Sequence, residues 1–234
     1  MIAFRPLPAL TTACAALFAV LVGLGVWQLE RLQWKLELIA RVNHNLQAAP
    51  VSLDDGATPQ SDYQRVALTG RFDGKEAYAF ATDETGAPVY HVLVPLTASN
   101  GRTFMVDRGI VPREKLDPAT RPAGLLTGTV RLVGVWRTPD APGSFTPPPD
   151  LAHRIWYARD VRGIAKADGV TLAAPVIIEA DATPNPGGWP KGGQTVVAFR
   201  NEHLQYAITW FGLAAVLLGV YLAYHVSRGR LRLG

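Results

Sequence analysis

Two uncharged apolar runs limit what this chain can fold into more than any other feature. Residues 206–224 contain nineteen residues without a charge, and residues 7–29 contain twenty-three. A helix rises 1.5 Å per residue, so the shorter run would be about 28 Å long, close to the hydrocarbon thickness of a bilayer. Each run is therefore long enough to cross a membrane once. The sequence predicts a protein with two membrane spans that flank a segment of about 160 residues.

The first run has a second interpretation, a cleaved signal peptide. It is longer than the apolar region of a typical signal peptide and has no Ala-x-Ala site at its end. We therefore interpret it as an uncleaved transmembrane helix. Small residues recur in both runs and predict close contact between the two helices, which favours a hairpin anchor over a cofactor slot. These residues are Ala15, Ala19, Gly23, Gly212, Ala215 and Gly219.

The basic residues predict the orientation of the spans. The formal net charge is +4, and Arg228, Arg230 and Arg232 lie just beyond the second run. Arginines next to a span favour the cytoplasmic side, so both termini are expected there and the central segment in a periplasm. A mitochondrial intermembrane space would be the counterpart, but the N-terminus lacks an Arg-rich, Ser-rich presequence. Basic residues do not alternate with aromatic residues, so nucleic acid is not an expected partner, whereas membrane lipid is.

The central segment alternates between apolar and polar residues with period two, which is typical of strands. A turn at residues 99–101 predicts a hairpin, and Asp160 and Gly169 predict the start and stop of one short helix at 160–167. We expect an α+β membrane protein in which two helices flank one mainly antiparallel β domain, curled into a barrel or a sandwich. The expected strands are 63–72, 76–81, 89–96, 102–110, 129–136, 155–158, 175–180 and 195–200.

These patterns divide the chain into six parts. Apolar residues spaced at three and four continue past the first run, so an amphipathic helical extension is expected there. The parts are a cytoplasmic N-terminus at 1–6, transmembrane helix 1 at 7–29, the amphipathic extension at 30–48, the periplasmic β-rich domain at 49–201, transmembrane helix 2 at 202–225 and a cytoplasmic basic tail at 226–234.

The residues do not form a recognisable catalytic arrangement. No Gly-x-Ser-x-Gly, His-Glu-x-x-His or Gly-rich phosphate loop is present, and the one cysteine, Cys14, excludes an internal disulfide and a Cys-x-x-Cys pair. An enzyme is not expected. Residues 138–149 contain five prolines and predict an irregular exposed loop, which is a candidate docking surface for other proteins.

His203 differs from the other four histidines in its position. It stands at the start of the second span, one helical turn before Tyr206 and two before Trp210. An imidazole at this depth would be able to bind a haem iron axially, with aromatic rings against the macrocycle. From the residues alone, an interfacial anchor that hydrogen-bonds to a lipid headgroup is favoured over a ligand. His44 and His153 are expected to be exposed, His91 to lie in a strand, and His225 to end the span.

Several stretches together closely resemble the Surfeit-locus family of cytochrome c oxidase assembly proteins, in its bacterial form. They follow the order of that family over nearly the whole chain. The C-terminal stretches are 192–195, 200–206 and 209–210; the others are 25–29 with Arg31 and 34–35, 63–66 with 70–73, 90–92 with 95–96, and 106–109 with 111–112. Ile110 departs from the pattern, because an aromatic residue is common there.

The resemblance implies an assembly factor for haem-copper cytochrome c oxidase in the bacterial inner membrane. It implies that haem a is bound transiently near the outer interface and inserted into the catalytic subunit, with haem a synthase as a possible second partner. His203 would be the axial ligand of the iron, Tyr206, Trp210 and Trp27 would wall the site, and Arg200 would meet a propionate. The alternative is a haem-free scaffold that stabilises assembly intermediates through protein contacts.

Overall fold

A computed structural model describes residues 3–139, 141–197 and 199–232. The chain divides into two compact units. A helical unit comprises Met1–Arg41 and Ala198–Gly234, and a β unit comprises Val42–Val197.

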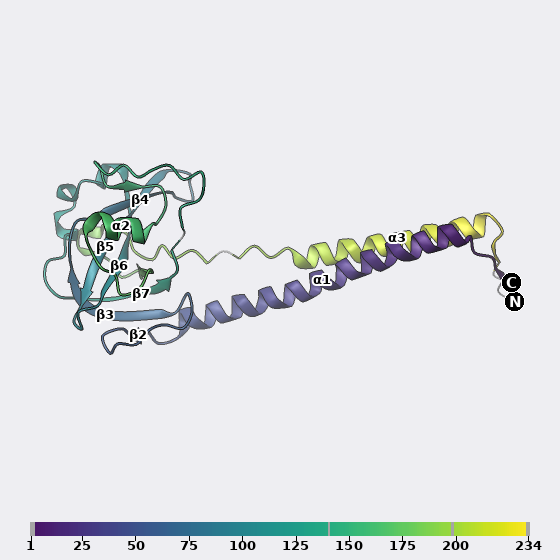
Figure 1. Ribbon diagram of the computed structural model, residues 1–234, viewed down its shortest axis with the longest axis horizontal. Coiled ribbons are helices and arrows are strands. Elements are labelled where there is room, and N and C mark those ends of the chain that lie inside the picture. The colour runs from purple at the N-terminus through teal and green to yellow at the C-terminus, as the bar shows by residue number, and fades with distance from the viewer. Residues whose placement is uncertain (1–2, 140, 198, 233–234) are drawn as a thin grey trace. The chain divides into compact units, whose positions relative to one another are not determined.

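The helical unit is an antiparallel pair of helices, α1 (Pro8–Gln47) and α3 (His203–Ser227) (Figure 1). Both are long and apolar enough to cross a membrane, with mean hydropathies of 2.2 and 1.8 over their most apolar windows. Helix α1 runs without a break through the predicted span and its predicted extension, because no proline or glycine pair interrupts residues 30–47. Before α1 and after α3, the short strands β1 (Ala3–Phe4) and β10 (Leu231–Arg232) pair with each other.

The two helices contact each other through residues other than the predicted ones. The least exposed positions of α1 include Leu21, Gly25 and Gln28, and those of α3 include Ala207 and Ala214. These positions recur at spacings of three, four and seven residues, the pattern by which two helices with nearly parallel axes contact each other. We call this line of contact the seam. The predicted interface of small residues was wrong, because its members lie outside this seam and are exposed: Ala15, Ala19, Gly23, Gly212, Ala215 and Gly219.

The β unit contains one eight-stranded sheet. Its strand order is β2-β3-β7-β9-β6-β5-β4-β8, and β3 also pairs with β5. The ring β3-β7-β9-β6-β5 is therefore closed, so the expected curled sheet is a barrel. The strands are β2 (Val51–Ser52), β3 (Arg65–Phe72), β4 (Ala77–Thr82), β5 (Pro88–Ala98), β6 (Thr103–Pro112), β7 (Val130–Arg137), β8 (Ile155–Trp156) and β9 (Ile177–Ala180).

Most strand pairs are antiparallel, as expected, while β2–β3, β4–β8 and β6–β9 are parallel. Closure of the ring depends on Gly70 in β3. A Cβ atom at Gly70 would lie 2.3 Å from the carbonyl oxygen of Thr97 in β5. Only glycine lets the two backbones approach this closely.

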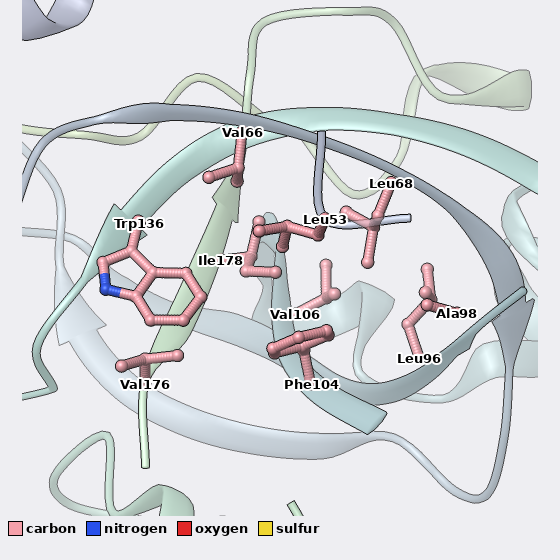
Figure 2. Close-up of a cluster of buried hydrophobic side chains, with 10 residues drawn as sticks. All are labelled: Leu53, Val66, Leu68, Leu96, Ala98, Phe104, Val106, Trp136, Val176 and Ile178. Atoms are coloured by element: carbon pink, nitrogen blue, oxygen red, sulfur yellow. The ribbon is translucent and has the colours of Figure 1, made fainter. Parts of the chain in front are cut away.

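A buried apolar cluster fills the barrel (Figure 2). Phe104 and Trp136 meet edge to face with ring centroids 6.0 Å apart, the arrangement that aromatic pairs favour. Each fully buried large apolar side chain contributes about 1.5–3 kcal/mol relative to exposure. The cluster consists of Leu53, Val66, Leu68, Leu96, Ala98, Phe104, Val106, Trp136, Val176 and Ile178.

Two local predictions were confirmed and one was wrong. Helix α2 (Val161–Asp168) begins after Asp160, whose carboxylate accepts a hydrogen bond from the Gly163 amide, and ends at Gly169 in the left-handed conformation. The hairpin around residues 99–101 joins β5 to β6. The predicted strand at 195–200 is absent over its described residues, 195–197 and 199–200. There Thr195 instead bonds through its side chain to the Glu179 carboxylate at 2.7 Å.

Candidate functional site

His203 is the first residue of α3, and its side chain bonds to α1. Its Nδ1 lies 2.7 Å from Oε1 of Gln28, whose side chain is buried. A carboxamide oxygen only accepts hydrogen bonds, so Nδ1 carries the proton and donates it. In a neutral imidazole this leaves the lone pair on Nε2, the nitrogen that is then available to a metal.

The seam between the helices explains why Gln28 can reach His203. One helical turn before Gln28, Gly25 lies against Phe211 of α3, and a Cβ atom there would stand 2.7 Å from two ring carbons. The missing side chain lets α3 pack close to the α1 backbone. At the opposite end of the pair, Thr11 Oγ1 and the phenolic Oη of Tyr221 lie 2.7 Å apart, so polar contacts join both ends of the hairpin.

The structure brings only some of the predicted site residues together. Trp210 lies two turns after His203 on the seam side of α3 and is partly buried. Tyr206 lies one turn after His203 and is 50% exposed, and Trp27 is 53% exposed. Trp27 immediately precedes Gln28, so its side chain is turned about 100° around α1 from the Gln28–His203 bond. Trp27 and Tyr206 therefore present aromatic surface outward beside the histidine.

Arg200 lies three residues before His203 and is engaged by a neighbour. Its Nε donates to Glu202 Oε1 at 2.6 Å, and its side chain is 84% exposed. The hydrogen bond and the charge of Glu202 raise the pKa of the guanidinium, so Arg200 is always a cation. Exposed pairs of this kind are weak and exchange readily, which leaves Arg200 able to meet another carboxylate.

Gln28 is a site residue that the sequence did not predict. It lies in the stretch 25–29, where the family resemblance points to Trp27. The available signal was polarity, because Gln28 is an amide inside an otherwise apolar run and needs a partner when buried. Its partner comes from 175 residues away, which no local pattern indicates.

The β unit contains two buried charged clusters that the sequence did not predict as such. Asp107 and Arg108 do not pair with each other: Asp107 lies 2.6 Å from His91 Nδ1, and Arg108 lies 3.7 Å from Glu76. Glu76 also accepts two hydrogen bonds from Arg121. Among the described residues, no three His, Cys, Asp or Glu side chains gather where they would hold a metal ion.

Comparison with known proteins identifies the relationship. The model of the SURF1 family matches residues 15–215. The chain is 37% identical over 231 residues to Surfeit locus protein 1 of Mus musculus, covering 90% of this chain and 74% of that protein. It is 36% identical over 215 residues to Surfeit locus protein 1 of Homo sapiens, covering 82% and 70%. A SURF1-like protein of Drosophila melanogaster is 36% identical over 232 residues, covering 90% and 75%. The chain belongs to the SURF1 family.

Proposed function

We propose that this protein is an assembly factor that holds haem a through His203 and assists its insertion into the catalytic subunit of cytochrome c oxidase. The SURF1 family consists of cytochrome c oxidase assembly factors. The finer part of the proposal, haem a as cargo, rests on the chemistry around His203, whereas haem a synthase as its source rests on the family resemblance alone.

The observation that carries the proposal is the hydrogen bond from His203 Nδ1 to Gln28. A ligand histidine almost always donates its second ring N–H to an oxygen, which orients the ring and makes the ligating nitrogen more basic. An interfacial anchor does not require a buried partner from another helix. The hydrogen bond therefore supports an axial ligand, in line with the role that the family resemblance implies for His203.

The neighbouring residues supply the rest of a haem site. Trp210, Tyr206 and Trp27 offer apolar ring surface to a macrocycle, and haem iron when bound accepts one imidazole nitrogen. Arg200 would meet a propionate by exchanging its exposed pair with Glu202, because guanidinium–carboxylate bonds form equally well with either partner.

The proposal is tested by purifying the full-length protein from a host that makes haem a. We expect His203→Ala to lose most of the bound haem in reduced-minus-oxidised spectra, while His44→Ala keeps it, because His44 is exposed and lies outside the site. Equal haem content in His203→Ala and the unaltered protein would exclude His203 as the ligand.

A second candidate function is a haem-free scaffold. Phe145 is fully exposed in the proline-rich loop of residues 138–149, of which all but residue 140 are described. A fully exposed aromatic side chain is a candidate anchor for a protein partner, because aromatic residues dominate the binding energy of many interfaces. Phe145→Ala should reduce copurification of oxidase subunits if the loop docks on them; unchanged copurification would count against a docking role.

We also propose the location and orientation: a bacterial inner membrane, both termini in the cytoplasm and the β unit in the periplasm. The arginines at 228 and 230 after α3 support this orientation.

A further inference from the structure

The β unit contains a buried cation, Arg108, that the proposed function does not use. Arg108 lies in β6 and is only 4% exposed, yet it lines a cavity of about 250 Å³. The other walls of this cavity come from the end of β3, from β7 and from the segment that follows β9. The volume is below the usual range of sites for drug-sized molecules, so the cavity suits a small ligand.

The guanidinium of Arg108 has hydrogen-bond donors that its neighbours do not use. Nη2 donates to the carbonyl oxygen of Gly124 at 2.7 Å and to Oδ1 of Asn185 at 3.1 Å. Among the described residues no hydrogen bond reaches Nε or Nη1, and neither atom is sealed from solvent. Phe72 covers a face of the guanidinium, with 4.8 Å between Cζ and the ring centroid, and leaves the in-plane donors free. The N–H groups on Nε and Nη1 are therefore available to a ligand.

The charge of Arg108 is only partly compensated. Glu76 lies 3.7 Å from Nη1, but Arg121 holds the same carboxylate with two hydrogen bonds. Tyr78 donates to Glu76 and stays neutral, because burial raises its pKa. Burial lowers the pKa of Arg108, Glu76 raises it and Arg121 lowers it again, although a guanidinium remains protonated. Two guanidiniums thus face one carboxylate, and an anion beside Arg108 would compensate the remaining buried charge.

The lining of the cavity selects the kind of anion. Two further charged residues line it, Arg131 and Asp181, and their opposite charges leave a single net positive charge, that of Arg108. A monoanion matches this charge, whereas a phosphate dianion would bring a second charge without a partner. A carboxylate can also accept two parallel hydrogen bonds from one guanidinium. Much of the wall is apolar: Phe72, Leu126, Val130, Leu132 and Val133.

We infer that this cavity binds a carboxylate with a short apolar substituent. The carboxylate oxygens accept hydrogen bonds from Nε and Nη1 of Arg108, and the substituent lies against the apolar wall. This site belongs to the β unit and does not depend on haem binding at His203.

The test uses the full-length protein in detergent, with 4-methylpentanoate as the probe in isothermal titration calorimetry. Neutral 4-methylpentanamide has nearly the same shape and controls for partition into the micelle, and inorganic phosphate controls for a general anion site. We expect the acid to bind at least about tenfold more tightly than either control, because only the acid makes charge-assisted hydrogen bonds and fits the apolar wall. Equal affinity of the acid and either control would overturn the inference.

Substitutions locate the bound acid. Asp181→Asn removes the negative charge from the wall but keeps an oxygen for the Thr183 amide, so the acid should bind severalfold more tightly. Thr183→Trp places a large ring at the wall and should block binding, whereas Thr171→Trp, at an exposed threonine outside the lining, should not. Arg108→Lys keeps the charge but loses the paired donors, so binding should weaken at least about tenfold.

Because Arg108 is buried, its variant is compared only if its circular dichroism and melting temperature match those of the unaltered protein. Unchanged affinity in both Asp181→Asn and Thr183→Trp would overturn the inference even if Arg108→Lys does not fold.

A free short-chain acid and the C-terminal residue of a polypeptide both supply such a carboxylate. The tripeptide acetyl-Gly-Gly-Leu ends in the same carboxylate and apolar chain as the probe and distinguishes the two sources. Tighter binding of the tripeptide than of 4-methylpentanoate, lost when its terminus is amidated, would assign the cavity to a chain terminus. Weaker binding of the tripeptide would assign the cavity to a free acid.

Discussion

At the residue scale, the most important contact is the hydrogen bond between the side-chain amide of Gln28 and the imidazole of His203. His203 alone would be one of several interfacial polar residues, and Gln28 alone would be a polar residue inside a span. In the proposed haem site, their hydrogen bond at 2.7 Å leaves Nε2 as the ligating nitrogen. The chemistry of the proposed site therefore belongs to the pair.

Replacing Gln28 with Leu should reduce haem affinity by about 10–100-fold, because the orienting acceptor is lost while the apolar volume is kept. Gln28→Glu keeps an acceptor oxygen and should retain most of the affinity. Haem titration of both variants by Soret absorbance checks this. If Gln28→Leu binds haem as tightly as the unaltered protein, the hydrogen bond does not orient a ligand.

Glu76 is the only carboxylate that the described structure places between the buried Arg108 and Arg121 guanidiniums. Its replacement by Gln leaves two cations facing each other out of contact with water. We expect a loss of about 3–5 kcal/mol in the free energy of unfolding. Urea denaturation followed by circular dichroism measures it, with the exposed Glu114→Gln as control. A loss below 1 kcal/mol would contradict this account of the cluster.

His91 should make stability depend on pH. Burial lowers the pKa of His91, and the nearby Arg159 lowers it further. The Asp107 carboxylate at 2.6 Å raises it, as Glu179 does to a smaller extent, and the net shift is upward. A group whose pKa is raised on folding stabilises the folded state fully at pH values below its unfolded-state pKa, which is about 6.5 for histidine. This stabilisation is lost as pH rises through the folded-state pKa. Compared with His91→Gln, the unaltered protein should lose stability in urea denaturation as pH rises above about 6.5. Parallel pH profiles would refute the coupling.

At the element scale, the seam between α1 and α3 determines where the proposed ligand lies. The seam passes through Leu21, Gly25 and Gln28 on α1 and through Ala207 and Ala214 on α3. The glycines and alanines that stood out in the sequence lie on exposed faces and do not hold the helices together. A Cβ atom added at Gly23, Gly212 or Gly219 would meet no atom within 4 Å. Small size alone did not identify the interface.

Gly25→Leu should therefore separate the helices and weaken haem binding, because its side chain would occupy the space of the Phe211 ring. Gly23→Leu is a matched control two residues away, where an added Cβ meets nothing within 4 Å. We expect a lower melting temperature in detergent and a lower haem content only for Gly25→Leu. Equal effects of the two substitutions would argue against this seam.

At the scale of the whole molecule, two helices able to span a membrane bracket a closed β barrel. If both cross the bilayer, the barrel lies on one side and the two termini on the other. Ser144→Cys and Arg228→Cys in a Cys14→Ser background test the proposed orientation. In intact spheroplasts, a membrane-impermeant maleimide should label only the cysteine at 144, which lies in the exposed proline-rich loop. Labelling at 228 instead would reverse the topology.

The sequence by itself determined the features that depend on local order along the chain. Uninterrupted apolar runs predicted the two long helices, period two predicted most strands, and Asp160 with Gly169 set the bounds of α2. These were predictable because hydrophobic periodicity and capping act within a few residues. His203 was likewise singled out by its position at the start of a span.

Only the tertiary structure decided which distant groups meet. It paired His203 with Gln28 and closed the barrel through β3 and β5. It also left residues 195–197 without a strand partner, since Thr195 bonds to Glu179 through its side chain. The physical reason is that a buried polar group must find a partner anywhere in the fold, and that partner is chosen by packing, which sequence spacing does not encode.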